Sequence, residues 1–193
     1  MTTITQLSDG RRRRTERSRQ AMIDAALSLI LGGNFAPTAK QISEEANVGI
    51  RSFFRQFEDM EELFAAVDEQ TVQAAIGSFS GGVREGSLED RLTSLVETYS
   101  SAFEENKMLL MTTQSLRWRS DHIKENYAKH QRWSKANIDA WIPEVLELSE
   151  TDRTLLQAQL SFELWHRLRE LQGVSLEEGR AAVLRVLNLL LGR

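Results

Sequence analysis

The sequence has no cysteine, only two prolines and no apolar run long enough to cross a membrane. Without cysteine there is no disulfide, no thiolate-bound zinc or iron–sulfur site and no cysteine nucleophile. No apolar stretch follows the basic residues near the N-terminus, so we expect no secretory signal and a cytoplasmic protein. Long stretches rich in Ala, Leu, Glu, Arg and Gln, with few breaks between them, predict a mostly helical fold.

The charged residues are unevenly distributed along the 193 residues. Nine basic and five acidic residues precede Glu58, whereas the rest of the chain has 15 basic and 23 acidic residues. A basic N-terminal third on an acidic body is expected when only one end of a protein meets a polyanion, because phosphate neutralisation needs local positive charge. The basic run Arg11–Arg14, taken alone, is equally well explained as a solvated tail.

Three helices are predicted in the N-terminal third. Apolar residues recur at helical spacing from about Arg14 to Leu31, and two glycines end this first helix. Thr38 is the predicted N-cap of a short second helix, which ends at Asn47, a residue that tolerates the left-handed conformation of a turn. A third short helix follows Gly49. Two short helices joined by a tight turn have the size of a helix-turn-helix.

Six further helices are predicted after Asp59, which gives about nine in total. The glycine-rich stretch Gly77–Ser87 is the clearest loop, and a helix spanning about Thr151–Leu171 precedes Gly173. The final helix, Ser175–Leu191, begins with a predicted capping box and has apolar residues around most of its circumference. One core needs only one apolar face, so we expect this helix to bury a second face against a partner.

The stretch TAKQISEEANVGIRSFFRQFEDMEELF, Thr38–Phe64, resembles the signature of the TetR family of bacterial transcription regulators. The family pattern aligns without a gap and is matched at Thr38, Ile42, Ala46, Val48, Phe53, Phe57, Asp59, Glu61 and Leu63. Close substitutions stand at Ser43, Asn47, Gly49, Ser52 and Phe54. The resemblance implies an all-α fold with two domains. Residues 1–58 would form a three-helix DNA-binding domain with a basic N-terminal arm, and residues 59–193 a larger helical domain for ligand binding and dimerisation.

The resemblance also implies which residues meet DNA. Thr38 would contact a phosphate, Arg51 would fork onto a guanine, and Ile50 would contact a thymine methyl group. The predicted DNA-binding residues are Arg11, Arg12, Arg13, Arg14, Thr38, Lys40, Gly49, Ile50, Arg51, Ser52, Phe54, Arg55 and Gln56. Two departures weaken binding, because Phe54 replaces a Tyr hydroxyl and Met60 replaces a Lys charge that are usual in the family.

The acidic body is predicted to hold an apolar pocket for a small hydrophobic or aromatic effector. The candidate residues are Tyr99, Phe103, Met108, Met111, Trp118, Trp133, Trp141, Phe162 and Trp165. Each of them, taken singly, is also explained by ordinary core packing. The resemblance implies a homodimer through the last two helices, which binds a palindromic double-stranded DNA operator as an effector-controlled repressor. No cofactor, metal or membrane partner is expected.

Two other functions compete with this interpretation. The best sequence signal for an enzyme is Glu163-x-x-His166, a spacing that supplies iron ligands in helical di-iron proteins. Such a site needs two copies and further glutamates, whereas one copy occurs here, and no P-loop or nucleophile elbow is present. We therefore expect no enzyme. The alternative that Phe54 and Met60 leave open is a helical protein-interaction module that has lost sequence-specific DNA binding.

Overall fold

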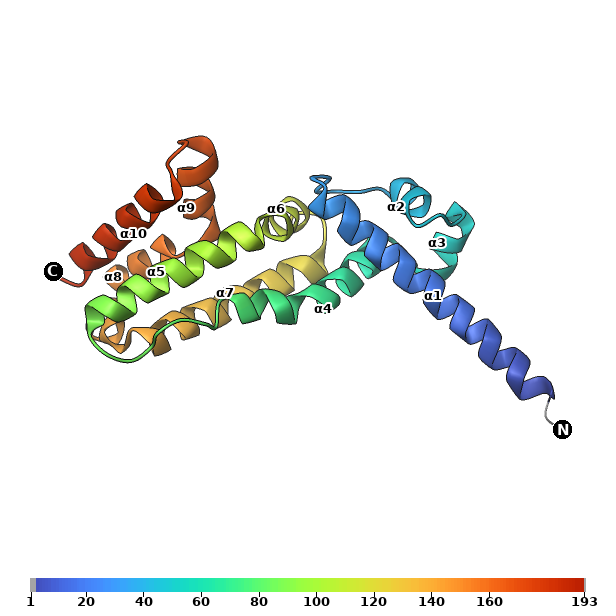
Figure 1. Ribbon diagram of the computed structural model, residues 1–193, viewed down its shortest axis with the longest axis horizontal. Coiled ribbons are helices and arrows are strands. Elements are labelled where there is room, and N and C mark those ends of the chain that lie inside the picture. Colours follow the sequence, from blue (N-terminus) through green and yellow to red (C-terminus); the bar gives the residue numbers. More distant parts are fainter. Residues whose placement is uncertain (1–2, 193) are drawn as a thin grey trace. The chain divides into compact units, whose positions relative to one another are not determined.

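The computed structural model describes residues 3–192, and the side chains of residues 13–192. Within these residues the chain forms ten α-helices and no strand, which confirms the all-α prediction (Figure 1). The helices are α1 (Thr3–Leu31), α2 (Ala39–Glu45), α3 (Ile50–Gln56), α4 (Met60–Ser78), α5 (Leu88–Glu105), α6 (Lys107–Leu116), α7 (Asp121–Trp141), α8 (Glu150–Gln159), α9 (Phe162–His166) and α10 (Leu176–Leu190). A 3-10 turn, η1 (Pro143–Glu147), precedes α8, and a π-helical turn, η2 (Arg167–Leu171), follows α9. No helix of the described chain combines the length and apolar character that crossing a membrane requires.

The chain divides into two compact units. The first comprises Met1–Val72 and Met111–Glu125, and the second comprises Gln73–Leu110 and Asn126–Arg193. Helices α4, α6 and α7 contribute residues to both units. A functional boundary after Glu58 stays a prediction, because compactness and function need not divide a chain at the same residue.

The first unit has a core formed by α1 to α4. Its fully buried side chains are Met22, Ala26, Ile30, Ile42, Phe53, Phe57 and Leu63. Helix α1 begins at Thr3, well before the start that the apolar spacing predicts, and its backbone continues through Arg11–Arg14. The basic arm is therefore helical rather than a flexible extended segment, since arginine is a good helix former and needs no apolar neighbour to continue a helix.

The second unit has a core contributed by α5, α7, α8 and α10. The fully buried side chains include Leu92, Leu95, Tyr99, Ile138, Trp141, Leu156 and Leu187. Serine side chains cap four of the helices in this unit by accepting a backbone N–H bond: Ser87, Ser149, Ser161 and Ser175. The predicted capping box is confirmed, because Glu178 also accepts the backbone N–H of Ser175 at 3.1 Å.

The helix predicted over Thr151–Leu171 is broken into α8 and α9. The break falls at Leu160 and Ser161, where the Ser161 hydroxyl accepts the backbone N–H of Leu164 at 3.3 Å and starts a new helix. Serine side chains compete in this way for backbone hydrogen bonds, so a serine inside an apolar periodic pattern marks a potential helix start.

Candidate nucleic-acid interface and aromatic cluster

A tight turn joins α2 and α3. The backbone N–H of Val48 donates to the carbonyl of Ser43 at 2.9 Å, and Asn47 has φ 51°, the left-handed conformation that its sequence predicts. Gly49 then adopts an extended conformation with φ −70° at the N-cap of α3. This arrangement has the two short helices and the tight turn of a helix-turn-helix.

The inner face of α3 is fixed by two phenylalanines. Phe53 and Phe57 are 0% and 1% exposed, and their ring centroids lie 5.5 Å apart. The guanidinium of Arg19, on α1, lies 4.8 Å from the centroid of the Phe57 ring. Because these contacts hold one face of α3 against the core of the first unit, the opposite face is held outward.

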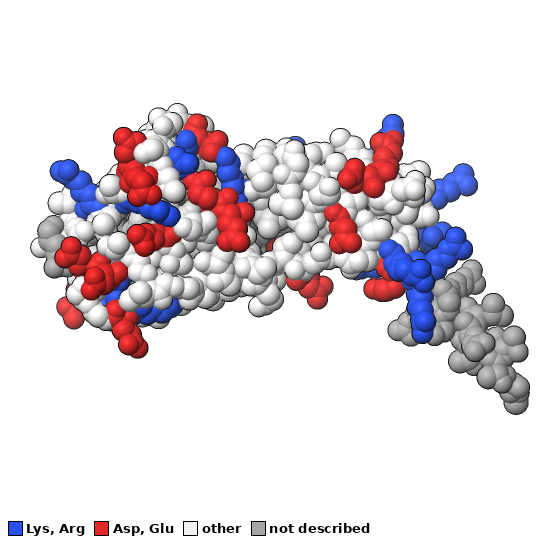
Figure 2. All heavy atoms as spheres, in the orientation of Figure 1, with Lys and Arg blue, Asp and Glu red and all other residues white. Residues whose placement is uncertain are grey.

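The outer face of α3 combines positive charge with exposed apolar surface. Ile50 is 41% exposed and Phe54 is 60% exposed, although Phe54 lies next to the fully buried Phe53. Arg51 and Arg55 are exposed, and the Arg55 guanidinium donates to the Ser52 hydroxyl at 3.3 Å. Neither arginine has an acidic partner within the described residues. Figure 2 shows basic side chains around α3 and the neighbouring part of α1.

The other predicted DNA-binding residues differ in their exposure and in their hydrogen-bond partners. The Thr38 hydroxyl already donates to the Gln41 side chain at 2.9 Å as part of the α2 capping box. Lys40 is exposed and lies 3.9 Å from the Glu44 carboxylate. Gln56 is half-buried and its amide nitrogen is fully buried, so this nitrogen does not face outward. Arg13 and Arg14 are exposed on α1. The side chains of Arg11 and Arg12 lie outside the described residues.

The second unit contains a cluster of aromatic rings, which we call the aromatic cluster. Its members are Phe79, Tyr99, Phe103, Trp133, Trp141 and Phe162. The centroid of the Phe79 ring lies 5.2 Å from that of Tyr99, 5.3 Å from that of Phe103 and 6.5 Å from that of Trp133. Sequence reasoning missed Phe79 because it lies in a glycine-rich stretch, although an aromatic residue in such a stretch is itself a signal of packing.

Hydrogen bonds fix the polar edge of the aromatic cluster. The hydroxyl of the buried Tyr99 accepts from the Asn137 amide at 3.0 Å, and burial raises the pKa of Tyr99. The indole N–H of Trp141 donates to the Val83 carbonyl at 2.8 Å, and the guanidinium of Arg84 lies 4.1 Å from the Trp141 ring centroid. These bonds attach the loop before α5 to α7.

Not all the predicted effector residues belong to the aromatic cluster. Met111 and Trp118 lie in the first unit, and Trp118 is 80% exposed with the Arg117 guanidinium 4.8 Å from its ring centroid. Trp165 is buried in the second unit, where its N–H donates to Glu104 at 3.0 Å, and Met108 is half-buried. The structure therefore brings together five of the nine predicted residues as ring neighbours: Tyr99, Phe103, Trp133, Trp141 and Phe162.

The residues of the possible di-iron motif have other contacts. Glu163 accepts a hydrogen bond from the Tyr127 hydroxyl at 2.5 Å, and the His166 ring stacks near Phe162 with centroids 5.6 Å apart. Within the described residues, no group of three or more His, Asp or Glu side chains is arranged to hold a metal ion.

A helix-turn-helix with an exposed basic second helix, followed by an all-helical second unit, is an arrangement typical of helical DNA-binding proteins. Residues 22–67 match the family model described as bacterial regulatory proteins, tetR family. The N-terminal part of the chain is thus similar to the DNA-binding domain of that family.

Solved structures share the fold over almost the whole chain. A transcriptional regulator from Rhodococcus sp. Rha1 has a TM-score of 0.66 and 16% identity, with 92% of this chain and 96% of that chain covered. A TetR family transcription regulator from Marinobacter aquaeolei VT8 has a TM-score of 0.56 and 20% identity, covering 94% and 97% of the two chains. The multidrug binding protein EbrR, solved with imidazole, has a TM-score of 0.62 and 17% identity over 87% and 93%. No curated protein matches the sequence.

Proposed function

We propose that this protein binds a double-stranded DNA operator as a homodimer and represses transcription until a small hydrophobic or aromatic effector changes its affinity. The outer face of α3 carries the proposal, because Arg51 and Arg55 are exposed there with no acidic partner among the described side chains, while Phe53 and Phe57 pack the opposite face against the core. Because chromosomal DNA is the proposed target, the proposed site of action is the bacterial cytoplasm.

The proposed contacts divide between bases and phosphates. At the start of α3, Arg51 forks onto the O6 and N7 acceptors of a guanine, and Ile50 contacts a thymine methyl group in the major groove. Arg55, one turn further, binds the phosphate backbone. The Phe54 ring, which is 60% exposed in the free protein, makes an apolar contact in the groove. This contact does not need the tyrosine hydroxyl that is usual in the family.

The proposed dimer forms through α8 and α10. These helices contact each other, and each also exposes leucine on its outer side: Leu155 of α8 is 47% exposed and Leu189 of α10 is 64% exposed. A two-fold symmetric pairing of these faces buries both leucines. Binding of the dimer to successive major grooves requires the two copies of α3 to lie about 34–36 Å apart, one DNA turn. A Leu189→Glu variant should shift the mass in solution from dimer to monomer.

The aromatic cluster supports the proposed effector site. Its rings belong to α5, α7, α9 and the turn after α4. Two of its members, Phe79 and Trp133, are half-buried rather than fully enclosed, and so is Arg84, which lies over Trp141. An effector that fits only one arrangement of these helices shifts the population of the dimer toward that arrangement and thereby changes the separation of the two recognition helices. The fold shared with a multidrug binding protein agrees with such a site.

Selection of bound sequences from a random duplex pool tests the proposal. Full-length protein at near-physiological salt is expected to enrich a two-fold symmetric site, and the mass of the complex should be that of one dimer or a pair of dimers. Transcription from a promoter that contains this site should fall when the protein is added. The selection should be repeated with protein that has been refolded free of small molecules. If no sequence is enriched with either preparation, the proposed operator binding is wrong.

The alternative is a protein-interaction module with the same fold. The exposed Phe54 and the 80% exposed Trp118 favour it, because large exposed aromatic side chains are typical of protein interfaces. Salt separates the two functions. DNA binding weakens steeply as ionic strength rises, whereas an apolar protein interface changes little.

A further inference from the structure

Two of the helices that belong to both units, α4 and α7, begin in the first unit. Helix α4 starts at Met60, and Phe57–Asp59 is the whole connection between it and α3. Helix α7 starts at Asp121 and continues into the second unit as far as Trp141. A contact between the first turns of α4 and α7 therefore connects the recognition helix α3 to a helix that continues into the second unit.

Glu61 of α4 makes such a contact. Its Oε1 accepts the Ser120 hydroxyl at 3.0 Å and the backbone N–H of His122 at 3.0 Å. The Ser120 hydroxyl in turn accepts the backbone N–H of Ile123 at 3.1 Å. All four residues belong to the first unit. One carboxylate oxygen thus satisfies, directly or through Ser120, two N–H groups at the start of α7 that have no partner within that helix.

Burial and charge both strengthen this contact. Ser120 and Ile123 are 7% and 8% exposed, and Glu61 is half-buried. Hydrogen bonds to a carboxylate are roughly twice as strong as those between neutral groups, and a negative charge is favourable at a helix N-terminus. If the first turns of α4 and α7 separated, Ser120 and the His122 N–H would lose this carboxylate, so the contact holds the two turns together.

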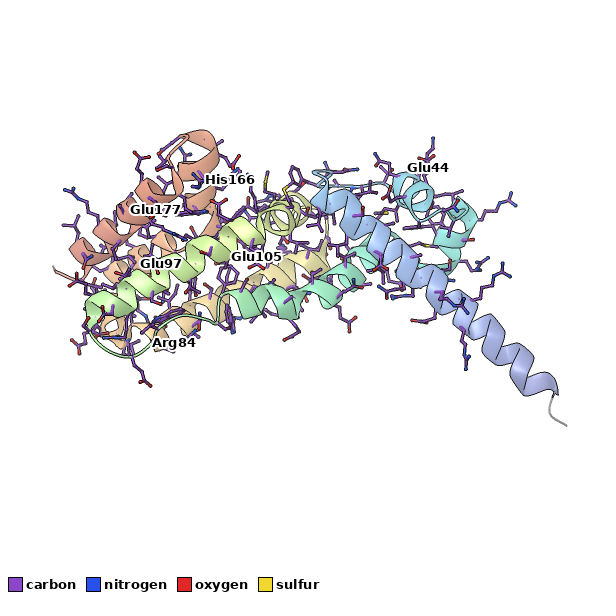
Figure 3. The ribbon with its side chains drawn as sticks, in the orientation of Figure 1. Glu44, Arg84, Glu97, Glu105, His166 and Glu177 are labelled. Carbon is purple, nitrogen blue, oxygen red and sulfur yellow. The ribbon has the colours of Figure 1, made fainter. Side chains whose placement is uncertain are left out.

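Other acidic residues of the first unit have different surroundings. Glu62, the next residue of α4, is exposed, accepts the backbone N–H of Glu58 at 2.8 Å and lies 3.9 Å from Arg19. Glu44 lies on α2 (Figure 3), where its side chain is 65% exposed. Negative charge alone therefore does not distinguish Glu61, whereas its partners at the start of α7 do.

We propose that Glu61 is a positioning residue for operator recognition, which fixes the separation of half-sites that the dimer accepts. This inference rests on the proposed operator binding. In this role Glu61 does not touch DNA. It bonds the turn behind α3 to α7, and α7 continues into the unit through which the two copies are proposed to pair. Without this bond each copy of α3 can shift against α7, and the dimer then accepts half-sites at more than one separation.

Operators with altered spacing test the proposal. One base pair is added or removed between the half-sites of the selected operator, which moves them by about 3.4 Å and turns them by about 34–36°. The full-length wild type should bind these duplexes about tenfold or more weakly than the original, whereas in Glu61→Ala the loss should shrink to about threefold or less. Glu61→Gln keeps the accepting oxygen and should restore most of the wild-type ratio. Glu62→Ala, which removes the same charge from the same turn, should keep that ratio.

The ratio of the two affinities separates positioning from stability, because partial unfolding lowers the affinity for every duplex by the same factor. Equal ratios in the wild type and Glu61→Ala, or the same shrinkage in Glu62→Ala, would overturn the positioning role. Hydrogen exchange of the His122 amide, which needs no DNA, should be faster in Glu61→Ala than in Glu62→Ala, and equal rates would overturn the contact itself. Failure of the wild type to enrich any operator would refute operator binding and the positioning role with it, while the exchange result stands.

Discussion

The arginines of α3 and three arginines of the second unit have opposite surroundings. In the second unit, Arg91 is bonded to Glu144, Arg153 to Asp139, and Arg169 to Glu104. In α3, Arg51 and Arg55 meet no carboxylate within the part of the chain that the structure describes. Figure 2 shows acidic and basic side chains next to each other on the second unit.

The difference separates charges that stabilise the fold from charges that are available to a ligand. The side chain of Arg91 is 12% exposed and also donates to the Trp141 carbonyl at 3.1 Å, so it joins α5 to the end of α7. Its hydrogen bond lowers the pKa of Glu144 below the usual range of a glutamate. Exposed arginines without acidic partners attract phosphate instead, because binding releases the counterions of the DNA and breaks no internal ion pair.

Breaking an internal pair should have the largest effect. Arg91→Met removes the charge-assisted hydrogen bonds to Glu144 and the bond to the Trp141 carbonyl, and it should lower the free energy of unfolding by about 2–3 kcal/mol. Urea unfolding measures this loss. Operator affinity of the folded variant should remain that of the wild type, and an unchanged stability would show that the pair contributes nothing.

Acid should remove the same interaction in the wild type. Because the pKa of Glu144 is lowered in the fold, its contribution is present at neutral pH and is lost as the pH falls through that lowered pKa. Unfolding free energies measured from neutral to acidic pH should therefore decline less in Arg91→Met than in the wild type. Equal declines in the two proteins would contradict the assignment.

Removal of an unpaired arginine should act on DNA binding alone. Arg51→Ala is expected to weaken operator binding by about 1–3 kcal/mol and to abolish the preference at one base pair of each half-site. The free energy of unfolding should change by less than about 0.5 kcal/mol, because Arg51 has no partner in the described chain to lose. Binding to a set of single-base operator variants measures the preference. A uniform loss across all of them would make Arg51 a phosphate contact.

A smaller effect is expected inside the helix-turn-helix. Ser43 of α2 is 2% exposed, and its hydroxyl has no hydrogen-bond partner within the described residues. Ser43→Ala removes this unpaired group and adds helix propensity, so the free energy of unfolding should rise by about 1 kcal/mol. Ser28→Ala, on the exposed side of α1, makes the same substitution where the hydroxyl donates to Glu45 at 3.2 Å, and it should not raise the stability. A loss of stability in Ser43→Ala would show that the hydroxyl has a partner.

The smallest effect is expected at the N-cap of α3. Gly49 caps the helix without a side-chain hydrogen bond, and a Cβ atom at this position meets nothing within 4 Å. Gly49→Ser should raise the free energy of unfolding by roughly a few tenths of a kcal/mol, because a serine hydroxyl accepts a hydrogen bond from a backbone N–H of the first turn. Thermal unfolding detects the change, and a marked fall in stability would contradict the open geometry.

The sequence predicts the helix-turn-helix well because its signals are local. The cap at Thr38 and the left-handed Asn47 follow from residue type, and both are present in the structure. The family pattern matches at Phe53 and Phe57, and both are buried. The orientation of Gln56 was not predictable, since helical spacing alone does not show that its amide nitrogen is buried.

The second unit is predicted less completely because its contacts join distant parts of the chain. Ring contacts between α5, α7 and α9 gather five of the candidate effector residues, whereas Trp118 is exposed elsewhere. The ring contacts of Phe79 depend on packing partners that no local pattern identifies. The break at Ser161 has a local signal, which is a serine within an apolar run. The helical spacing of the apolar residues around it nevertheless predicts one continuous helix.

The salt dependence of operator binding tests most directly whether the unpaired arginines of α3 meet DNA. The logarithm of the binding constant is measured against the logarithm of the salt concentration for the wild type, Arg55→Ala and Arg153→Ala. The slope should become shallower by about one for each phosphate contact that Arg55→Ala removes, whereas Arg153→Ala, which breaks an internal pair, should keep the wild-type slope. Identical slopes in all three proteins would contradict the account.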